Sequence, residues 1–474
     1  MLGQVIPGQP PELENDPITT HTGPAPVVAI VGRPNVGKSS LFNRILARRN
    51  AIVSDEPGTT RDRLIAEVEW SDRRLILVDT GGLESDPQGP IRKMVQEQAD
   101  MAMAGADLIV FMTSATEGLT ATDEVLADRL RLAKKPLILA VNKVDNDTRE
   151  FSASEFYRLG IANTVLISAY HNFGIYELMD QVLSLLPEEP GQGLSDENGE
   201  ETAAQTGEED LRLSIVGRTN VGKSLLVNAI LGQERSIVSE IAGTTRDALD
   251  TQFTYKEQPI TLIDTAGIRR PGRVERGIEY YSVLRAVNAV NRSHITCLVT
   301  DAGQLATMQD AHIAGLAWDM CRGLIVVVNK WDLMTETRRY SIERATAKVQ
   351  ERLHFMSYIP ICFTSALHRQ GINSLLQTAL RLHTERKRWI STRQLQYTLA
   401  RALTDHSPPI VKGQKGQRLR IDRLMQVDIN PPTFLFSVNN PNLIHFSYQR
   451  YLENRIRETF GFDHTHLRLI FKKK

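Results

Sequence analysis

Two segments of the chain have the residue types and spacing of a phosphate-binding loop. Gly32-Arg-Pro-Asn-Val-Gly-Lys-Ser39 and Gly217-Arg-Thr-Asn-Val-Gly-Lys-Ser224 both match GxxxxGK[ST], and each follows a short apolar run. In such a loop the glycines let successive backbone N–H groups surround a phosphate at the start of a helix. Lys38 and Lys223 would reach the β- and γ-phosphates, and the hydroxyls of Ser39 and Ser224 would bind Mg²⁺. The sequence therefore predicts two nucleotide sites.

Two aspartates are expected to support the magnesium ions. Asp79 and Asp264 each end an apolar run and precede Thr-x-Gly. A carboxylate in this position can lie in the second coordination shell of Mg²⁺. The N–H groups of Gly82 and Gly267 can reach the γ-phosphate. An aspartate at the end of a strand is often only a cap, but the Thr-x-Gly that follows favours the catalytic interpretation.

A third motif specifies the base. It reads Asn142-Lys-Val-Asp145 in one place and Asn329-Lys-Trp-Asp332 in another. Its carboxylate can accept from N1–H and the exocyclic amine of guanine, whereas adenine has no donor at N1 and would leave the carboxylate poorly paired. The asparagines can bond the purine edge, and the lysine stems can lie against the ring. The other candidate nucleotide-binding residues are Gly32, Asn35, Gly37, Ser40, Lys143, Ser168, Ala169, Gly217, Asn220, Gly222, Lys330, Ser365 and Ala366.

These motifs form two copies of one arrangement. The phosphate loop, a Gly-Thr-Thr-Arg-Asp segment (58–62 and 243–247) and the Asp-Thr-x-Gly segment all recur 185 residues later, and the base motif recurs after 187. Most motifs begin at or just after an apolar run, and helical patterns separate the runs. The runs are 27–31, 75–78, 108–112, 137–141 and 164–167, then 213–216, 260–263, 295–299, 324–328 and 359–363. This predicts two doubly wound α/β domains with mostly parallel sheets and ligands at the carboxyl ends of the strands.

Length and composition agree with several soluble domains. At about 150 residues per domain, 474 residues suggest about three. The first 26 residues contain six prolines and no Lys or Arg, which predicts a disordered extension and a cytoplasmic protein. No CxxC pair is present, so we expect no metal or redox role for the cysteines. The expected division is an extension at 1–26, GTPase domains at 27–187 and 211–383, an acidic linker at 188–210, and a third domain at 384–474.

The zero net charge hides an uneven distribution. Residues 384–474 hold 17 Lys and Arg against 7 Asp and Glu, and residues 187–210 hold nine acids and no base. The acidic segment reads as a solvated tether that leaves the first copy free to move. The basic tail is an electrostatic surface for phosphate backbones. The cations that we assign to this surface are Lys412, Lys415, Arg418, Arg420, Arg423 and 472–474.

The order of motifs resembles the translation-factor-related GTPases, and the tandem arrangement resembles the bacterial double-Era-like family known as Der or EngA. The tail segments 431–436, 439–441 and 447–462 are similar to the KH-like domain of that family. The resemblance implies that Thr60 and Thr245 order a switch on Mg²⁺. It also implies that Asn35 and Asn220 help to hold K⁺ beside the phosphates.

Several positions depart from the pattern of related GTPases, and one tail segment matches a motif of KH domains. Leu83 and Ile268 stand where Ras-like proteins have a water-orienting Gln, so we expect slow intrinsic turnover. No Asp stands near Thr113, although the second copy has Asp301. Residues 463–466 read Asp-His-Thr-His, which we interpret as an exposed turn rather than a metal site. Residues 413–416 match the Gly-x-x-Gly clamp of KH domains, but we favour an ordinary basic loop.

Three functional hypotheses make different demands on the chain. The leading hypothesis is a monomeric GTP-hydrolysing assembly factor for the large ribosomal subunit, whose nucleotide state gates binding to ribosomal RNA. The second is an RNA-binding module in which one GTPase site is structural and the other switches. A membrane-remodelling GTPase would need an amphipathic anchor or stalk, which the tail does not resemble. RNA-modifying relatives carry extra substrate domains, for which no sequence remains.

Overall fold

The computed structural model describes residues 24–47, 64–71, 73–82, 91–146, 149, 151, 153–187, 210–232, 237–239, 250–265, 281–337, 341–356, 358–408 and 418–473. Several predicted features lie outside these residues. They are most of the extension and of the acidic linker, both Gly-Thr-Thr-Arg-Asp segments with Thr60 and Thr245, Leu83, Gly267, Ile268, and 413–416.

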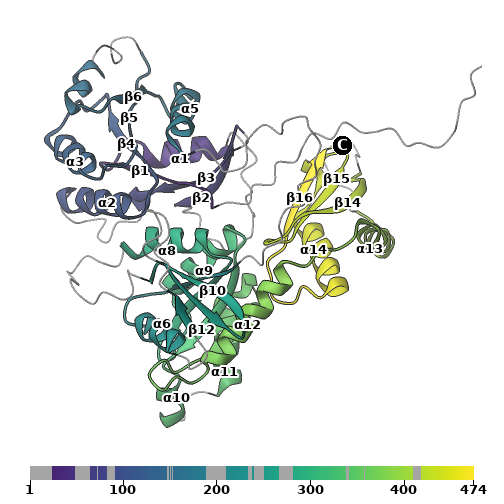
Figure 1. Ribbon diagram of the computed structural model, residues 1–474. Helices are drawn as coiled ribbons and strands as arrows, with labels where there is room; N and C mark the ends of the chain where they lie inside the picture. The colour runs from purple at the N-terminus through teal and green to yellow at the C-terminus, as the bar shows by residue number, and fades with distance from the viewer. Residues whose placement is uncertain are drawn as a thin grey trace, which may run out of the picture.

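The first copy is a six-stranded sheet of order β2-β3-β1-β4-β5-β6, in which only β2 and β3 are antiparallel (Figure 1). The strands are β1 (Val27–Gly32), β2 (Ile65–Trp70), β3 (Arg73–Asp79), β4 (Leu108–Ser114), β5 (Leu137–Asn142) and β6 (Asn163–Leu166). The helices are α1 (Lys38–Ala47), η1 (Thr80–Gly82), α2 (Ile91–Gly105), α3 (Ala121–Arg131), η2 (Ala153–Leu159) and α5 (Ile175–Leu185). One hydrophobic core joins the sheet to α1 and α5, and another joins it to α2 and α3. Both faces of the sheet are covered, which is why β1 and β4 are buried at every position.

The second copy has a seven-stranded sheet of order β13-β12-β11-β7-β10-β9-β8. Its strands are β7 (Leu211–Val216), β8 (Ile237–Ser239), β9 (Thr251–Tyr255), β10 (Gln258–Ile263), β11 (Ile295–Asp301), β12 (Gly323–Asn329) and β13 (Ile361–Phe363). Its helices are α6 (Lys223–Leu231), α8 (Tyr281–Arg292), α9 (Met308–Asp319), α10 (Asp332–Thr337), α11 (Ile342–Arg352), η3 (His354–Met356) and α12 (Ile372–Arg386). Helices α6 and α12 share one core with the sheet, and α8, α9 and α11 share the other. Two mostly parallel α/β sheets are therefore present, as the sequence predicts.

The third domain is a three-stranded sheet with two long helices on one face. It comprises α13 (Thr392–Asp405), β14 (Ile421–Asp428), β15 (Thr433–Val438), η4 (Pro441–Leu443), α14 (Phe446–Phe460) and β16 (Arg468–Lys473). Strand β15 lies in the middle, antiparallel to β14 and parallel to β16. Residues of α13 and α14 pack on Phe434 and Phe436 of β15.

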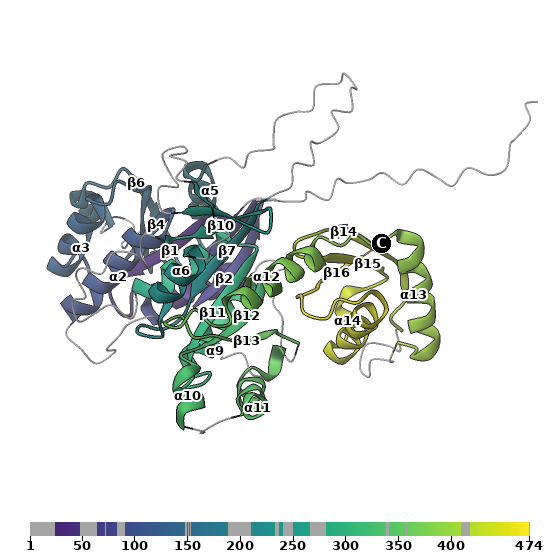
Figure 2. The ribbon, with the colours of Figure 1, turned by 60° about the horizontal axis from the view of Figure 1, so that its bottom comes forward.

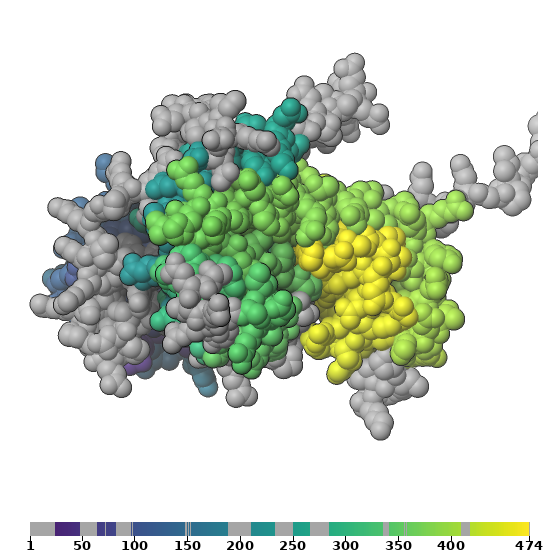
Figure 3. All heavy atoms as spheres, turned by 90° about the horizontal axis from the view of Figure 1, so that it is seen from below, coloured from purple at the N-terminus to yellow at the C-terminus, as the bar shows by residue number. Residues whose placement is uncertain are grey.

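Helix α12 runs from the second domain toward the third (Figure 2), and buried charges at its end connect the two domains. The Arg386 guanidinium is fully buried and donates to Asn430 Oδ1 at 2.8 Å, Thr465 Oγ1 at 3.1 Å and Cys321 O at 2.9 Å. The Glu385 carboxylate accepts from the backbone N–H of Thr465 at 3.0 Å. A buried charge with several hydrogen bonds is costly to separate from its partners, so α12 joins the two domains firmly. Figure 3 shows the third domain packed closely against the second.

The Asp-His-Thr-His segment belongs to this joint, and its interpretation as an exposed turn was wrong. Thr465 is fully buried, and the His466 ring lies edge-on to Trp318 of α9 with ring centroids 4.0 Å apart. Burial and nearby arginines hold the pKa of His466 well below its usual range. The described residues contain no cluster of three or more His, Cys, Asp or Glu side chains placed to hold a metal ion.

The first copy is docked on the second. Helix α2 packs against α8, its counterpart in the other copy (Figure 1). A methyl group added to Gly105 would lie 2.7 Å from Leu284 Cβ, so the two helices are in close contact. Asn291 of α8 donates to Ala25 O at 2.6 Å, and one hydrophobic core contains residues of both copies. The sequence did not predict this contact, because residues 187–210 read as a tether that leaves the first copy free to move.

None of the described helices is both long enough and apolar enough to span a lipid bilayer.

Candidate nucleotide sites

The phosphate loop of the first copy is preorganised by its lysine. Lys38 is 6% exposed, and its ammonium donates to Gly32 O at 2.7 Å and Arg33 O at 2.9 Å. These bonds fold the loop around the ammonium group. Gly37 has φ +102°, and a Cβ there would lie 2.2 Å from Asn142 Nδ2, so glycine is needed at this position.

The second loop repeats this arrangement. Lys223 donates to Gly217 O at 2.8 Å and to Arg218 O at 2.5 Å. Burial lowers the pKa of the Lys223 ammonium to about 8, and the nearby Asp310 carboxylate offsets this only in part. A phosphate bound in the loop would stabilise the charged ammonium. Asn35 and Asn220 have φ of 64° and 62°, so the loops share the same left-handed turn.

Two of the residues expected at the magnesium site of the first copy, Ser39 and Asp79, lie together. Ser39 Oγ donates to Asp79 Oδ2 at 2.6 Å, which brings the end of β3 to the start of α1. The other oxygen of Asp79 accepts from Gly81 N–H at 2.9 Å, and Gly82 follows in η1. A hydroxyl and a carboxylate are oxygen groups of the kind that Mg²⁺ prefers.

The corresponding region of the second copy is arranged differently. Asp264 has φ +57°, and its N–H donates to Asp250 Oδ1 at 2.9 Å. Thr265 is buried and shares a hydrogen bond of 2.7 Å with the Thr251 hydroxyl. The end of β10 is therefore held to β9.

The base-motif asparagine of the first copy links three loops. Asn142 is 3% exposed, its Nδ2 donates to Val36 O at 2.8 Å, and its Oδ1 accepts from Ala169 N–H at 3.0 Å. One amide thereby connects the phosphate loop, the base motif and the Ser168-Ala169 pair. Both of these contacts are with the backbone, so the amide holds the three loops together.

The second copy has the same link. Asn329 Nδ2 donates to Val221 O at 2.9 Å, and Oδ1 accepts from Ala366 N–H at 3.0 Å. The Thr364 hydroxyl also donates to this oxygen at 3.2 Å. Ser365 and Ala366 are thus brought to the same site as the phosphate loop.

The missing aspartate of the first copy has a structural substitute. In the second copy Lys330 pairs with Asp301 at 2.7 Å, and Asp301 lies beside Asn329 across the sheet. The residue in the corresponding place of the first copy is Ser114, and Lys143 instead lies 3.5 Å from Glu117. Sequence reasoning missed Glu117 because it lies in the loop after β4.

A further pair of residues escaped the sequence analysis. Arg33 Nε donates to Asp123 Oδ1 at 2.8 Å, and Arg218 Nε donates to Asp310 Oδ1 at 3.2 Å. Each aspartate also belongs to the capping box that begins α3 or α9. The phosphate loop is therefore anchored to a helix start in both copies. The 92-residue spacing of Arg218 and Asp310 gives no local signal.

The base-motif carboxylates lie at the ends of β5 and β12. Asp145 forms an ion pair with Arg149, and Asp332 Oδ2 lies 4.0 Å from His368 Nε2. Both aspartates are therefore at the sheet edge that carries the phosphate loops, as the sequence predicts.

Comparisons with known proteins agree with this geometry. A family profile described as 50S ribosome-binding GTPase matches residues 27–143 and 212–330, and one described as the C-terminal KH-domain-like region of EngA bacterial GTPase enzymes matches 389–472. GTPase Der of Thermomicrobium roseum is 46% identical over 95% of this chain and 96% of its own length. The chain belongs to the Der family. The Der proteins of Herpetosiphon aurantiacus and Symbiobacterium thermophilum are 45% and 46% identical, over 94% and 95% of the chain and 96% and 92% of their own lengths.

Membership of the Der family identifies the activity of the protein. This Der-family protein is a GTPase with tandem nucleotide domains, and its nucleotides are GTP and GDP with Mg²⁺. The third domain is KH-like, as the resemblance of residues 431–462 implied.

Proposed function

We propose that both copies use the predicted residues in the same roles. Lys38 and Lys223 neutralise charge on the β- and γ-phosphates, and backbone N–H groups at Gly82 and Gly267 bind the γ-phosphate. The proposed Mg²⁺ residues are Ser39, Thr60 and Asp79 in the first copy and Ser224, Thr245 and Asp264 in the second. The bond of 2.6 Å between Ser39 and Asp79 supports this set.

We also propose that the domains divide near residues 26, 187, 210 and 383.

We propose that K⁺ stimulates hydrolysis through Asn35 and Asn220. A cation beside the phosphates would stabilise the negative charge that develops during hydrolysis, in place of the absent Gln. The matching left-handed conformations of the two asparagines support one role in both loops. Turnover measured in KCl should exceed turnover in NaCl, and Asn35→Ala with Asn220→Ala should remove the difference. Equal rates for the wild type in both salts would contradict the proposal.

We propose that the protein is a cytoplasmic assembly factor that acts on the large ribosomal subunit. Its GTPase domains match a family described as 50S ribosome-binding. The KH-like domain supplies a surface for ribosomal RNA. Arg423, Ser437 and Lys472 lie side by side across its three strands, on the face opposite the two helices. Arg423 and Lys472 are exposed.

We propose that nucleotide state at the first site gates this binding. Strand β2 begins three residues after the Gly-Thr-Thr-Arg-Asp segment and carries Glu67, which pairs with Arg468 of the KH-like domain at 3.2 Å. A change in the order of that segment would act on β2 and hence on the contact between the domains. Gating requires contacts that differ between nucleotide states.

Co-sedimentation with ribosomal subunits tests the proposal. Binding should depend on whether GTP analogue, GDP or no nucleotide is present. Arg423→Ala with Lys472→Ala should weaken binding and reduce the salt slope of log K by about 1 to 2, because each lost phosphate contact removes about 0.7 to 0.9 of slope. Arg393→Ala, an exposed cation on α13, is the matched control. Equal binding in all three nucleotide states would exclude gating, and binding only to the small subunit would exclude the large-subunit assignment.

A further inference from the structure

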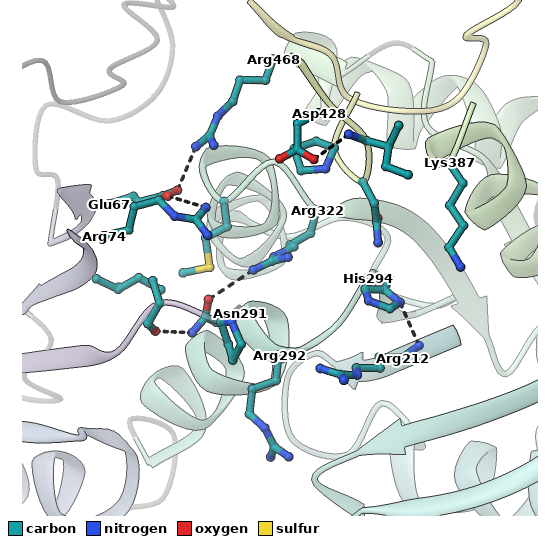
Figure 4. A pocket seen from close by; sticks show the side chains of 17 residues that line it. Glu67, Arg74, Arg212, Asn291, Arg292, His294, Arg322, Lys387, Asp428 and Arg468 are labelled. Atoms are coloured by element: carbon teal, nitrogen blue, oxygen red, sulfur yellow. Dashed lines mark hydrogen bonds and ion pairs between the residues drawn. The ribbon is translucent and has the colours of Figure 1, made fainter. Parts of the chain in front are cut away.

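A cavity of about 240 Å³ lies where the three domains meet. This exceeds by far the roughly 10–15 Å³ that one water molecule needs. Each domain contributes an arginine to its lining: Arg74 from β3, Arg322 from the turn before β12, and Arg468 from β16 (Figure 4). These residues are far apart in the sequence, so only the docked arrangement brings them together.

The charges around the cavity do not balance. The cations in its lining are Arg74, Arg212, Arg292, Arg322, Lys387 and Arg468, and the carboxylates are Glu67 and Asp428. Arg292 pairs with Asp250, which is not part of the lining. Arg292 apart, the lining holds four guanidinium groups and two carboxylates.

The single carboxylate Glu67 serves two guanidinium groups. It lies 3.4 Å from Arg74 and 3.2 Å from Arg468. Arg322 has a weaker partner, since its Nη2 donates to the neutral amide of Asn291 at 3.3 Å. The buried Nε atoms of Arg322 and Arg468 find no hydrogen-bond acceptor among the described residues. Burial and the neighbouring arginines lower the pKa of Arg322 to about 10, although Glu67 opposes this.

The second carboxylate, Asp428, is engaged by a backbone group of its own loop. Asp428 accepts from the backbone N–H of Ile429 at 2.7 Å, and burial raises its pKa. The cavity therefore presents guanidinium groups from three directions, and two of them have a buried Nε without an acceptor among the described residues. Guanidinium groups bind phosphate oxygens through paired N–H donors.

We propose that this cavity binds a small ligand with two linked phosphate groups, distinct from the nucleotides in the two GTPase sites. A diphosphate is negatively charged, which suits a lining rich in guanidinium groups, and it has enough oxygen atoms to accept from all three arginines. Because all three domains contribute arginines to the lining, the bound ligand stabilises their docked arrangement.

Calorimetric titration with inorganic pyrophosphate tests the proposal on the full chain, with both GTPase sites first saturated with GDP. The wild type should bind one further pyrophosphate per chain. Arg322→Gln, Arg74→Gln and Arg468→Gln, one from each domain, should each weaken this binding at least tenfold. Arg292→Gln is the matched control, because its partner lies outside the cavity, and it should change the affinity less than twofold.

Two additional measurements keep the result clear. Arg212→Gln removes an exposed side chain from the lining without altering a buried contact, so it should fold normally and weaken binding about threefold. Pyrophosphate should raise the thermal midpoint of the wild type in a concentration-dependent way and leave that of Arg322→Gln unchanged. The proposal would be overturned if no additional pyrophosphate site were found, or if the three arginine variants and the control had equal affinity. It would also be overturned if the cavity bound RNA phosphates but not pyrophosphate.

Discussion

Replacement of Asn142 by Ala isolates the link between the phosphate loop and the base-binding loops. The substitution removes the donor to Val36 O and the acceptor for Ala169 N–H, and it leaves both backbone groups without their partner. An unsatisfied buried group costs about 1–3 kcal/mol. The two groups together should therefore make the free energy of nucleotide binding less favourable by at least about 2 kcal/mol. This corresponds to roughly a thirtyfold loss of affinity, at about 1.4 kcal/mol per factor of ten.

The assay is the affinity of the first site for fluorescent GDP, measured in a Lys223→Ala background that disables the second site. Asn146→Ala is the control, because Asn146 is exposed four residues further along and its side chain accepts from the N–H of Arg149. Urea unfolding monitors whether the variant remains folded. A folded Asn142→Ala protein that binds GDP within twofold of the control would refute the idea that this amide organises the site.

Three further predictions concern the same sites. Asp145→Asn and Asp332→Asn should each move the preference of their own site from guanosine to xanthosine nucleotides, because an amide can donate to the carbonyl that replaces the guanine amine. Competition binding with XDP and GDP measures this preference. An unchanged preference for GDP would exclude these aspartates from base recognition. The lowered pKa of Lys223, about 8 against an ordinary 10.5, means that the folded nucleotide-free protein binds fewer protons than the unfolded chain between these pH values, so its stability should rise with pH across this window. GDP binding near pH 8.5 should accordingly take up protons, seen as a calorimetric enthalpy that depends on the buffer, and Lys223→Met should abolish the uptake. Gly37→Ala should prevent nucleotide binding at the first site because of its positive φ and the clash 2.2 Å from the Asn142 amide, whereas Gly315→Ala on α9, whose new methyl group meets nothing within 4 Å, should be neutral or stabilise by up to about 1 kcal/mol in urea unfolding.

The buried strands were predictable because continuous apolar runs have few alternatives. The runs at 27–31 and 108–112 correspond to β1 and β4 within two residues. The edge strand β2 was missed, since Ile65–Trp70 mixes apolar and charged residues and is covered unevenly. Hydrophobic patterns predict a strand that is covered on both faces more reliably than they predict a strand at the edge of a sheet.

The sequence motifs predicted the residues of the site, but they did not predict the contacts that hold those residues in place. The phosphate loops and base motifs have fixed spacing, so their convergence follows from parallel topology. Glu117 and the pairing of Arg218 with Asp310 depend on where separate loops meet, which one sequence does not encode locally. The same holds for Arg386 and its partners in two domains, and for the contact between α2 and α8.

The contact between α2 and α8 also resembles the interface of a homodimer, because the same helix of each copy faces its duplicate. Here the two halves belong to one chain, and only residues 188–209 of the tether separate the described parts of the two copies. A linker of this kind gives an effective concentration on the order of millimolar. An interface that would be too weak to hold separate molecules together at cellular concentrations can therefore remain mostly closed, yet still open and close within one molecule. Cutting the tether would convert this intramolecular equilibrium into a bimolecular one that dilution shifts toward separation.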